Sequence, residues 1–484
     1  MKNTLILFGL FLSISMFSQQ LITLEQAIEV AQKNSPEYKA LVNQNQASYW
    51  RYRNFKAGLL PQLRLDATLP SYSNSINRIT DDNGDDIFVE TNQSRLQGVL
   101  SLNQNLAFTG GTLSFSSQFE RVDLFASDAT RFSVIPFSIN YSQNSLLYNE
   151  FKWQKKIEPL IYEEAKRDLI EGMEDISINT TRRYFALLKA QVQKRIAKSN
   201  FSNQDTLFQI SKGRFKMGKI AENDLLQIEL SVLNAENELI TNQIRFKRSS
   251  QNLSRYLILD TENILLNTPK ELSTFTVTVE KALEEAKSNR KAVIEFRRRR
   301  LQAEQDVAEV NGNNKLQMSF RANFGISQQG EVFTDLFQDY NQQQNLVLSL
   351  GIPILDWGVS KSRKKLVEAN KDLVNTNVKQ DEQEFEQEIY LHTLNWQNQR
   401  NFLKTAEKAQ EIAIRRYEIT KKRFILGKIT ITDLNLALQE KDRSILSYLN
   451  SLEKFWTDYY TLRRLTLYDF IKNKKIKVED LIYD

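Results

Sequence analysis

The segment FQISKGRFKMGKIAENDL at residues 208–225 recurs at residues 417–434 as YEITKKRFILGKITITDL, with nine identities in eighteen positions and an offset of 209. The start of each copy is marked too, because TLEQAIEVAQKNS from Thr23 aligns with TVEKALEEAKSNR from Thr278. Self-similarity at a fixed spacing is typical of a duplicated structural unit. We therefore predict an internal twofold repeat, in which each half is a helix, strands, a long helix, a tight turn and a returning helix.

Each half contains a long stretch with almost no Gly or Pro, at about residues 146–216 and 359–426. In the first stretch Phe201, Phe208 and Phe215 are seven residues apart, which is the spacing of a coiled coil. A helix of this length extends for roughly 100 Å at 1.5 Å per residue. The pattern predicts long antiparallel helical hairpins rather than helices of a globular domain.

Both long helices end at a glycine followed by a lysine, at Gly218 and Gly427. Glycine can adopt the left-handed conformation that closes a helix C-terminus, and a basic neighbour suits the negative end of the helix dipole. We predict tip turns at residues 217–220 and 427–430. The candidates for capping the returning helices are Asn223 or Asp224 in the first half and Thr430 or Thr432 in the second.

Between the helices the hydrophobic period changes from about 3.6 to 2, at about residues 60–145 and 316–355. The alternating runs are about nine residues long, which matches a tilted strand that crosses a membrane. We predict four strands in the first half and two in the second, with Gly110 and Gly111 in a hairpin turn rather than a phosphate-binding loop. Four to six strands cannot close a barrel alone, so the chain is expected to oligomerise.

The first 19 residues have the features of a signal peptide, with Lys2 before an apolar run that ends in small or polar residues. The sequence has no Cys and one His, and its net charge of +6 comes from 65 basic and 59 acidic residues spread along the chain. This charge does not indicate a nucleic-acid partner. The basic run at residues 297–300 is expected to be a solvated helix face.

No pattern for catalysis, metal binding or a cofactor is recognisable in the sequence. His392 lies within a helical pattern with no acidic constellation around it, so we expect a structural role for it. The acidic segment at residues 81–86 has oxygen ligands suited to Ca²⁺, but it lacks the spacing of a calcium loop. We expect a solvent-exposed strand connection there. The sequence predicts no enzyme, no cofactor and no metal site.

These features resemble the TolC-like family of outer-membrane efflux proteins over nearly the whole chain. The resemblance rests on the duplicated tip pattern of Arg, an aromatic residue, Gly and a later Asp-Leu. The matching residues are Arg214, Phe215, Gly218, Asp224 and Leu225, then Arg423, Phe424, Gly427, Asp433 and Leu434. Three further motifs agree, at residues 24–37, 60–63 and 352–358.

The resemblance implies a homotrimer whose strands form a transmembrane β-barrel in the outer membrane of a Gram-negative bacterium and whose helices form a periplasmic tunnel. The barrel would contact outer-membrane lipid. The tips would meet a periplasmic adaptor protein that links the duct to an inner-membrane pump of the RND or ABC type. The expected adaptor contacts are Arg214, Phe215, Gly218, Lys219, Arg423, Phe424, Gly427 and Lys428.

The resemblance also implies a constriction at the periplasmic end, for which the expected residues are Asp224 and Asp433. We expect Asp433 to line this constriction and Asp224 to pair with Lys428 between the two hairpins. The position three residues after Asp433 is Leu436, so a second acidic ring is not expected. The substrate is not encoded in any recognisable pattern, and drug efflux, metal export and protein secretion stay open.

The predicted organisation is a signal peptide at 1–19, a first repeat at 20–257, a connector at 258–277, a second repeat at 278–466 and a tail at 467–484. The fold class is mainly α with a transmembrane β-barrel portion. Two alternatives stay open. Four strands per chain would give a barrel of 12 strands and six would give 18, and a coiled-coil scaffold with small soluble sheets would need no barrel.

Overall fold

The computed structural model describes residues 21–80, 84–260, 264–272 and 275–477. The predicted signal peptide and part of the acidic segment at 81–86 lie outside the described residues. The chain divides into two compact units, which are described separately. The first comprises Met1–Asn43, Asp168–Arg290 and Glu386–Asp484, and the second comprises Gln44–Arg167 and Lys291–Phe385.

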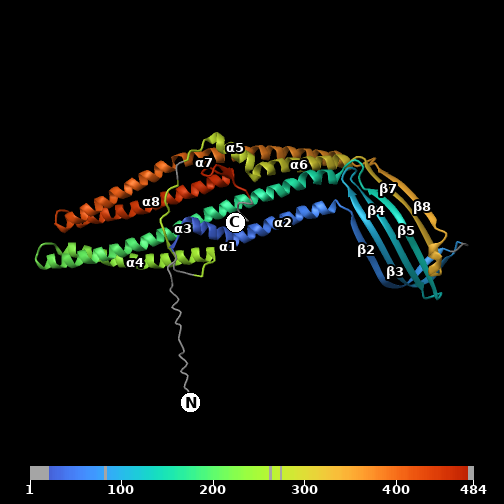
Figure 1. The fold of residues 1–484 in the computed structure, drawn as a ribbon, viewed down its shortest axis with the longest axis horizontal. Coiled ribbons are helices and arrows are strands. Elements are labelled where there is room, and N and C mark those ends of the chain that lie inside the picture. The colour runs from blue at the N-terminus through green and yellow to red at the C-terminus, as the bar shows by residue number, and fades with distance from the viewer. Residues whose placement is uncertain (1–20, 81–83, 261–263, 273–274, 478–484) are drawn as a thin grey trace, which may run out of the picture. The chain divides into compact units, whose positions relative to one another are not determined.

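Each helix of the first half of the chain has a counterpart of equal length in the second half, and Figure 1 labels these helices. The pairs are α1 (Leu24–Asn34) with α5 (Val279–Asn289), α2 (Pro36–Gly58) with α6 (Lys291–Asn313), α3 (Glu150–Lys216) with α7 (Val359–Ile425), and α4 (Glu222–Leu257) with α8 (Ile431–Thr466). Their lengths are 11, 23, 67 and 36 residues respectively. The initial helix of each half is interrupted, at Ser35 in the first half and at Arg290 in the second.

Among the described residues, no helix is both long and apolar enough to cross a membrane.

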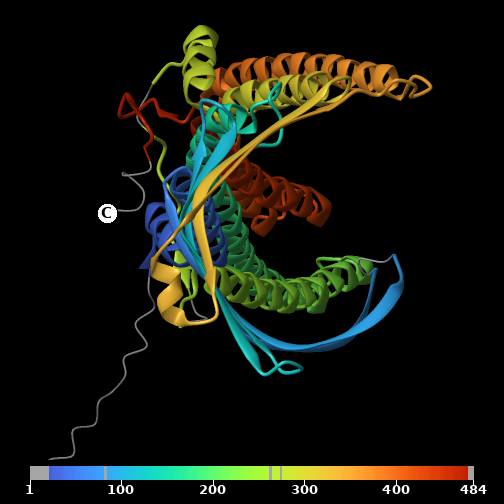
Figure 2. The same cartoon turned by 90° about the vertical axis from the view of Figure 1, so that its right-hand side faces the viewer.

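The second unit contains a single sheet of six antiparallel strands in the order β2-β3-β4-β5-β7-β8. The strands are β2 (Gln62–Thr80), β3 (Asp86–Leu106), β4 (Gly111–Leu124), β5 (Ala129–Gln143), β7 (Gln317–Gly330) and β8 (Asn341–Gly351). Strand β3 pairs with β4 only from Gln93 to Leu106, so the far end of the β2–β3 hairpin extends beyond the rest of the sheet (Figure 2).

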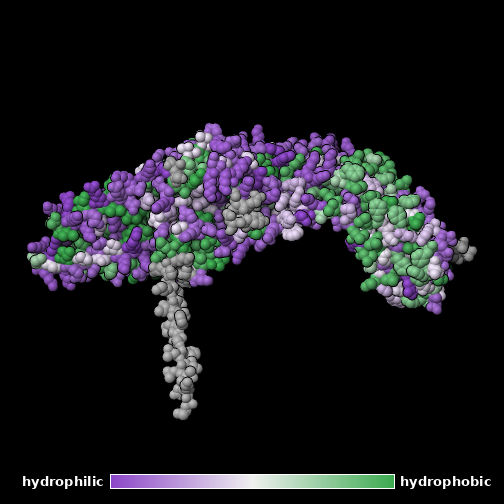
Figure 3. Space-filling model, in the orientation of Figure 1, coloured by the Kyte–Doolittle hydropathy of each residue, from purple (hydrophilic) through white to green (hydrophobic). Residues whose placement is uncertain are grey.

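The two faces of this sheet differ in chemistry, because residues paired across antiparallel strands project to the same side. One face is apolar and includes Leu63, Leu65, Leu100, Leu102, Leu113, Phe115, Phe137, Ile139, Phe320, Phe324, Leu346, Leu348 and Leu350. The other is polar and includes Arg64, Asp66, Ser101, Asn103, Ser114, Ser116, Ser138, Asn140, Ser319, Asn323, Asn345 and Ser349. In Figure 3, hydrophobic residues gather over the strands.

The turn between β3 and β4 is the predicted hairpin turn, and it is anchored by groups near the start of α3. Gly110 has a φ of +90°, which favours glycine. The Asn149 amide donates to the Ala107 carbonyl at 3.0 Å, and the Gln143 amide donates to the Thr109 carbonyl at 2.7 Å. This turn therefore lies at the end of the sheet where the helices enter and leave it.

Four helical segments of the second unit lie side by side in the order α2-α3-α6-α7. Arg51 of α2 pairs with Glu158 of α3 at 2.9 Å, and Arg298 of α6 pairs with Glu164 of α3 at 2.7 Å. Arg300 of α6 reaches Glu382 of α7 at 2.8 Å. The basic run at 297–300 was expected to be a solvated helix face, but three of its arginines hold neighbouring helices together, since Arg299 also pairs with Asp381 of α7 at 2.5 Å.

The short segments complete the two units. In the first, β1 (Leu21–Ile22) pairs in parallel with β6 (Leu265–Leu266), and β9 (Tyr468–Asp469) pairs with β10 (Lys474–Lys475). In the second, the 3₁₀ helix η1 (Phe333–Phe337) connects β7 to β8. Its Phe333 ring lies 6.0 Å from the Phe119 ring, on the apolar face of the sheet.

Candidate functional site

Each helical hairpin of the first unit turns through the same hydrogen-bonded motif. In the first tip, the Gly218 N–H donates to the Phe215 carbonyl and the Lys219 N–H to the Arg214 carbonyl, both at 2.9 Å. In the second tip the equivalent bonds join Gly427 to Phe424 and Lys428 to Arg423, at 2.8 and 3.0 Å. The two glycines have φ values of +66° and +71°. This is the Schellman motif, so the predicted left-handed glycines are confirmed.

The returning helices begin differently in the two halves. Thr430 is the N-cap of α8 and forms a capping box with Asp433. Thr430 was one of the two residues predicted to cap this helix. In the first half the N-cap is Ala221, which makes no side-chain cap. The prediction of Asn223 or Asp224 as the cap was wrong, because α4 begins at Glu222 and both residues lie in its first turn.

Asp433 has a defined environment within the second tip. Its carboxylate accepts hydrogen bonds from the Thr430 hydroxyl at 2.7 Å and from the Thr430 N–H at 3.1 Å. These bonds stabilise the charged form and hold the pKa of the carboxyl below its ordinary value of 3.8. Asp433 therefore carries a negative charge at any pH above that value.

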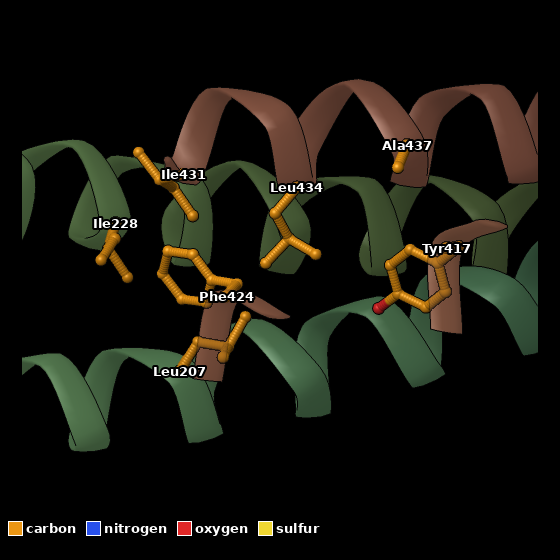
Figure 4. Close-up of a cluster of buried hydrophobic side chains, with 7 residues drawn as sticks. All are labelled: Leu207, Ile228, Tyr417, Phe424, Ile431, Leu434 and Ala437. Atoms are coloured by element: carbon orange, nitrogen blue, oxygen red, sulfur yellow. The ribbon is translucent and has the colours of Figure 1, made fainter. Parts of the chain in front are cut away.

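The tips of the two hairpins share one buried hydrophobic cluster, shown in Figure 4. It comprises Leu207 of α3, Ile228 of α4, Tyr417 and Phe424 of α7, and Ile431, Leu434 and Ala437 of α8. Burial raises the pKa of Tyr417 to about 12, so its hydroxyl stays neutral. The cluster ties the first hairpin to the second near their tips.

The predicted tip residues differ in exposure. The Phe424 side chain is 9% exposed because it fills the shared cluster, whereas its repeat equivalent Phe215 is 39% exposed. Arg214 donates to the Ile425 carbonyl at 2.5 Å and so bridges the two tips. A groove of about 740 Å³ lies between the tips, and Arg214, Lys219, Asp224 and Phe424 are among its lining residues.

The expected pair of Asp224 and Lys428 does not form in the part of the chain that the structure describes. Asp224 lies in the first turn of α4, where unsatisfied backbone N–H groups favour a carboxylate without a cationic partner. Lys428 follows the glycine of the second tip. Both residues stay at the tips, but they are not joined.

Two outward-facing apolar stripes were not anticipated from the sequence. On α4, Leu226, Leu230, Leu233, Ile240 and Ile244 are all more than half exposed. Phe402, Ile412 and Ile419 of α7, and Leu426 directly after its end, are also more than half exposed. The α4 set has spacings of three, four and seven residues, and the α7 set has spacings of seven and ten, in which Ile412, Ile419 and Leu426 share one position of a heptad. That spacing could have been found in the sequence.

Acidic residues recur beside the α4 stripe and basic residues recur beside the α7 stripe, where Glu411 and Glu418 also lie. Glu222, Glu229 and Glu236 recur every seven residues beside the α4 stripe, and Lys408, Arg415 and Lys422 recur every seven residues beside the α7 stripe. Arg416 and Arg423 lie within the α7 stripe itself. Within this chain Arg245 of α4 contacts Gln193 of α3, Lys189 of α3 pairs with Glu453 of α8, and Arg416 of α7 pairs with Glu440 of α8. The order α4-α3-α8-α7 places the two stripes at opposite lateral edges of the paired hairpins.

The six-stranded sheet also has two free lateral edges. Among the residues that the structure describes, strand β2 pairs only with β3, and strand β8 pairs only with β7. All residues of β2 and β8 are exposed, whereas most residues of the inner strands are partly covered. Free edges on both sides leave backbone groups of β2 and β8 available to pair with a strand of another chain.

Among the described residues, no group of three His, Asp or Glu side chains is arranged to hold a metal ion. The His392 ring lies within hydrogen-bonding distance of the Asp458 carbonyl, at 2.9 Å, and so links α7 to α8.

The sequence of residues 282–466 matches the family model described as outer membrane efflux protein. No curated protein matches the chain. Among solved structures, a membrane protein from Pseudomonas aeruginosa is similar, with a TM-score of 0.65, 14% identity, and coverage of 92% of this chain and 90% of that chain.

Two further solved structures are similar over most of their length. The CmeC outer membrane channel of Campylobacter jejuni has a TM-score of 0.65 and 14% identity, with coverage of 93% of this chain and 88% of that chain. The outer membrane protein VceC of Vibrio cholerae has a TM-score of 0.60 and 14% identity, with coverage of 94% and 97%. At these identities the structural matches establish the fold.

Proposed function

We propose, since the chain belongs to the TolC-like family of outer membrane efflux proteins, that three copies close into one exit duct. In this duct the sheets of the second unit form a single transmembrane barrel. The hairpins of the first unit surround the periplasmic end of the same passage. Substrate moves passively through a polar lumen, and an inner-membrane pump supplies the energy.

The observation that carries this proposal is the six-stranded sheet with one apolar face, one polar face and two unpaired edges. In a barrel the apolar face contacts lipid and the polar face lines water. An open edge in hydrocarbon would leave backbone groups unpaired, at several kcal/mol each. A coiled-coil scaffold with small soluble sheets has no use for an apolar face that continues across six strands.

The contacts between copies follow from the lateral edges. Rotation about a threefold axis brings the α4 edge of one copy against the α7 edge of the next, in a heterologous contact that closes after three copies. The two helices are antiparallel, because α4 leaves its tip and α7 approaches its own. A register that levels Leu226, Leu233 and Ile240 with Leu426, Ile419 and Ile412 also levels Glu229 with Arg423 and Glu236 with Arg416.

The charges support this register. Acidic residues on α4 then face basic residues on α7 in the neighbouring copy, as in coiled coils that select their partner by flanking charges. Arg416 would share its charge between Glu236 of that copy and Glu440 of its own chain, with which it pairs. Burial of the two stripes removes exposed leucine and isoleucine side chains from water, and each such side chain contributes about 1.5–3 kcal/mol when fully buried.

The tips are the proposed adaptor-binding surface. Phe215, Lys219 and Lys428 present side chains or charge there, whereas Arg214 and the two glycines set the shape of the turns. Phe424 does not contact the adaptor in this proposal; it supports the surface by packing in the cluster that holds the tips together. Asp433 and Asp224 are proposed to line the constriction at this end.

The duplicated architecture of the chain is part of the same proposal. The equal helix lengths of 11, 23, 67 and 36 residues in the two halves support an internal repeat. The sheet has four strands from the first half and two from the second. The strands therefore do not follow the twofold repeat of the helices, and we propose that the first half gained a hairpin.

Reconstitution into planar bilayers tests the duct, with the mass of the detergent-extracted protein measured in parallel. Discrete channels from a particle of three chains are the expected result. A monomer or dimer that stays in solution without detergent and forms no channel would overturn the proposal. A trimer that needs detergent but conducts only after Asp433→Asn would indicate a closed periplasmic end and would support the duct.

A further inference from the structure

The six strands of the second unit form one sheet without a gap. Strand β3 pairs with β2 from Asp86 to Asn103 and with β4 from Gln93 to Leu106. Strand β4 pairs in turn with β5 along nearly its whole length, from Thr112 to Leu124. No hairpin lies on the surface of the sheet as a separate layer in the part of the chain that the structure describes.

We propose that the barrel of the assembled protein has 18 strands, closed by pairing of β2 in one copy with β8 in the next. This inference rests on the proposed trimeric duct and adds the size of its barrel and the strands that close it. Three sheets of six strands supply the count, and the free edges β2 and β8 supply the seam.

Each of the six strands has the properties of a membrane strand. The shortest, β8, has 11 residues, and a strand needs about 9–11 residues to cross the bilayer. Each strand also contributes aliphatic or aromatic side chains to the same apolar face, including Leu100 of β3 and Phe115 of β4. The chemistry of the strands therefore gives no reason to place any two of the six outside the lipid.

Removal of a hairpin from the sheet would also be costly. A barrel of 12 strands needs four strands per chain, so a hairpin such as β2–β3 would have to separate from β4. The β3–β4 ladder joins 14 residue pairs, from Gln93↔Leu124 to Leu106↔Gly111. Breaking it within lipid leaves its backbone groups unpaired, at several kcal/mol each.

The free edges are compatible with each other in direction and chemistry. Strand β2 runs away from the helices and β8 runs back toward them, so the seam is antiparallel like every other pair in the sheet. Leu63 of β2 and Leu348 of β8 lie on the apolar face, and Arg64 and Ser349 lie on the polar face. A copy-to-copy seam thus continues both faces around the barrel.

The number of strands decides how wide the passage is at the membrane. With strands about 4.8 Å apart and tilted by about 45°, 18 strands give a perimeter of roughly 120 Å and 12 strands give roughly 80 Å. The cross-section of the wider barrel is then about twice as large.

Disulfide cross-linking tests the seam, because the sequence has no native Cys. Arg64→Cys combined with Ser349→Cys should link copies into dimers and trimers on a denaturing gel, and Gln62→Cys or Asp66→Cys in place of Arg64→Cys covers a shift in register. Arg64→Cys with Ser101→Cys and Ser114→Cys with Asn140→Cys are the controls, since each pair is directly opposite within one chain. The controls should form cross-links that leave the mass of one chain unchanged.

Electron microscopy of the same trimers in nanodiscs gives the strand count. Eighteen strands with β2 next to β8 of a neighbour is the expected image. A trimeric barrel of 12 strands, or a link from Ser349→Cys to Ser114→Cys in place of Arg64→Cys, would overturn the inference while the duct remains. A particle without a barrel would instead overturn the proposed function itself.

Discussion

Arg463 of α8 donates two hydrogen bonds to the carboxylate of Glu174 of α3, from Nε to Oε2 at 2.9 Å and from Nη2 to Oε1 at 2.6 Å. The Glu174 side chain is fully buried. Replacement of Glu174 by Ala leaves a buried guanidinium without its main partner, which typically costs about 3–5 kcal/mol. We expect the free energy of unfolding to fall by this amount, as measured by chemical denaturation followed through helical circular dichroism.

The adjacent pair of Arg464 and Asp175 is the matched control, because it joins the same two helices. The Asp175 side chain is 49% exposed, and the pair is 3.1 Å apart. Asp175→Ala should cost under about 1 kcal/mol, since solvent screens exposed pairs. Equal losses for the two variants would contradict the assignment of Glu174 as a buried anchor.

A side chain at the glycine of the second tip is expected to lower the stability of the protein. Gly427 has a φ of +71° with open space around it, so Gly427→Ala suffers backbone strain rather than a clash. We expect a loss of about 1–2 kcal/mol in the same unfolding measurement. Gly213 lies within α3, also in open space, and Gly213→Ala should instead stabilise by up to about 1 kcal/mol. If Gly427→Ala lowers the free energy of unfolding and Gly213→Ala raises it, the loss comes from the conformation of the turn. A gain in stability from Gly427→Ala would contradict this.

Asp433 is expected to set the ion preference of the duct. Asp433→Asn removes three negative charges from a trimeric constriction, so the ratio of cation to anion permeability in planar bilayers should fall severalfold. An unchanged ratio would place Asp433 outside the passage.

The pH dependence of that preference gives a second test of Asp433. Its folded-state pKa lies below 3.8, so the stabilising charge is present above the unfolded value and is lost only as pH falls through the lower, folded value. The native channel should therefore keep its cation preference at about pH 4. Thr430→Ala removes the hydroxyl hydrogen bond, which is the larger cause of the lowered pKa, and keeps the bond from the backbone N–H. The cation preference of this variant should therefore weaken at a higher pH than that of the native channel.

Charge reversal tests the proposed contact between α4 and α7 of neighbouring copies. Glu229→Arg or Arg423→Glu alone places like charges together, at a cost of roughly 0.5–1 kcal/mol per contact and roughly 2 kcal/mol for a ring of three. The fraction of trimer, measured by native mass spectrometry, should fall in each single variant and recover in the double variant. Recovery that is absent at low salt would argue against this register.

The sequence predicted the elements whose pattern is local. The tip turns follow from Gly218 and Gly427, whose left-handed conformation needs no information from elsewhere in the chain. The strands of the apolar face follow from simple alternation, as at Phe320 and Phe324. These patterns reflect backbone geometry and the division between lipid and water, and both act over a few residues.

Features that depend on packing between distant segments were not predictable in the same way. The burial of Phe424 depends on Leu207, which is more than 200 positions away, whereas its equivalent Phe215 has no such cover. The far halves of β2 and β3 were also missed, because Ser71, Ser73 and Ser75 face polar partners and show no hydrophobic period. Their strand structure comes from the ladder between them rather than from side-chain patterning.

The equal lengths of α3 and α7, at 67 residues each, keep the two tips at the same level. Seven residues added to one of them would displace its tip by about 10 Å relative to the other. Phe424 and Leu207 would then no longer meet, and the two tips would cease to present one level rim. Any variant of this protein with a longer or shorter reach must therefore change both arms of each hairpin by the same length, in α3 and α4 and again in α7 and α8.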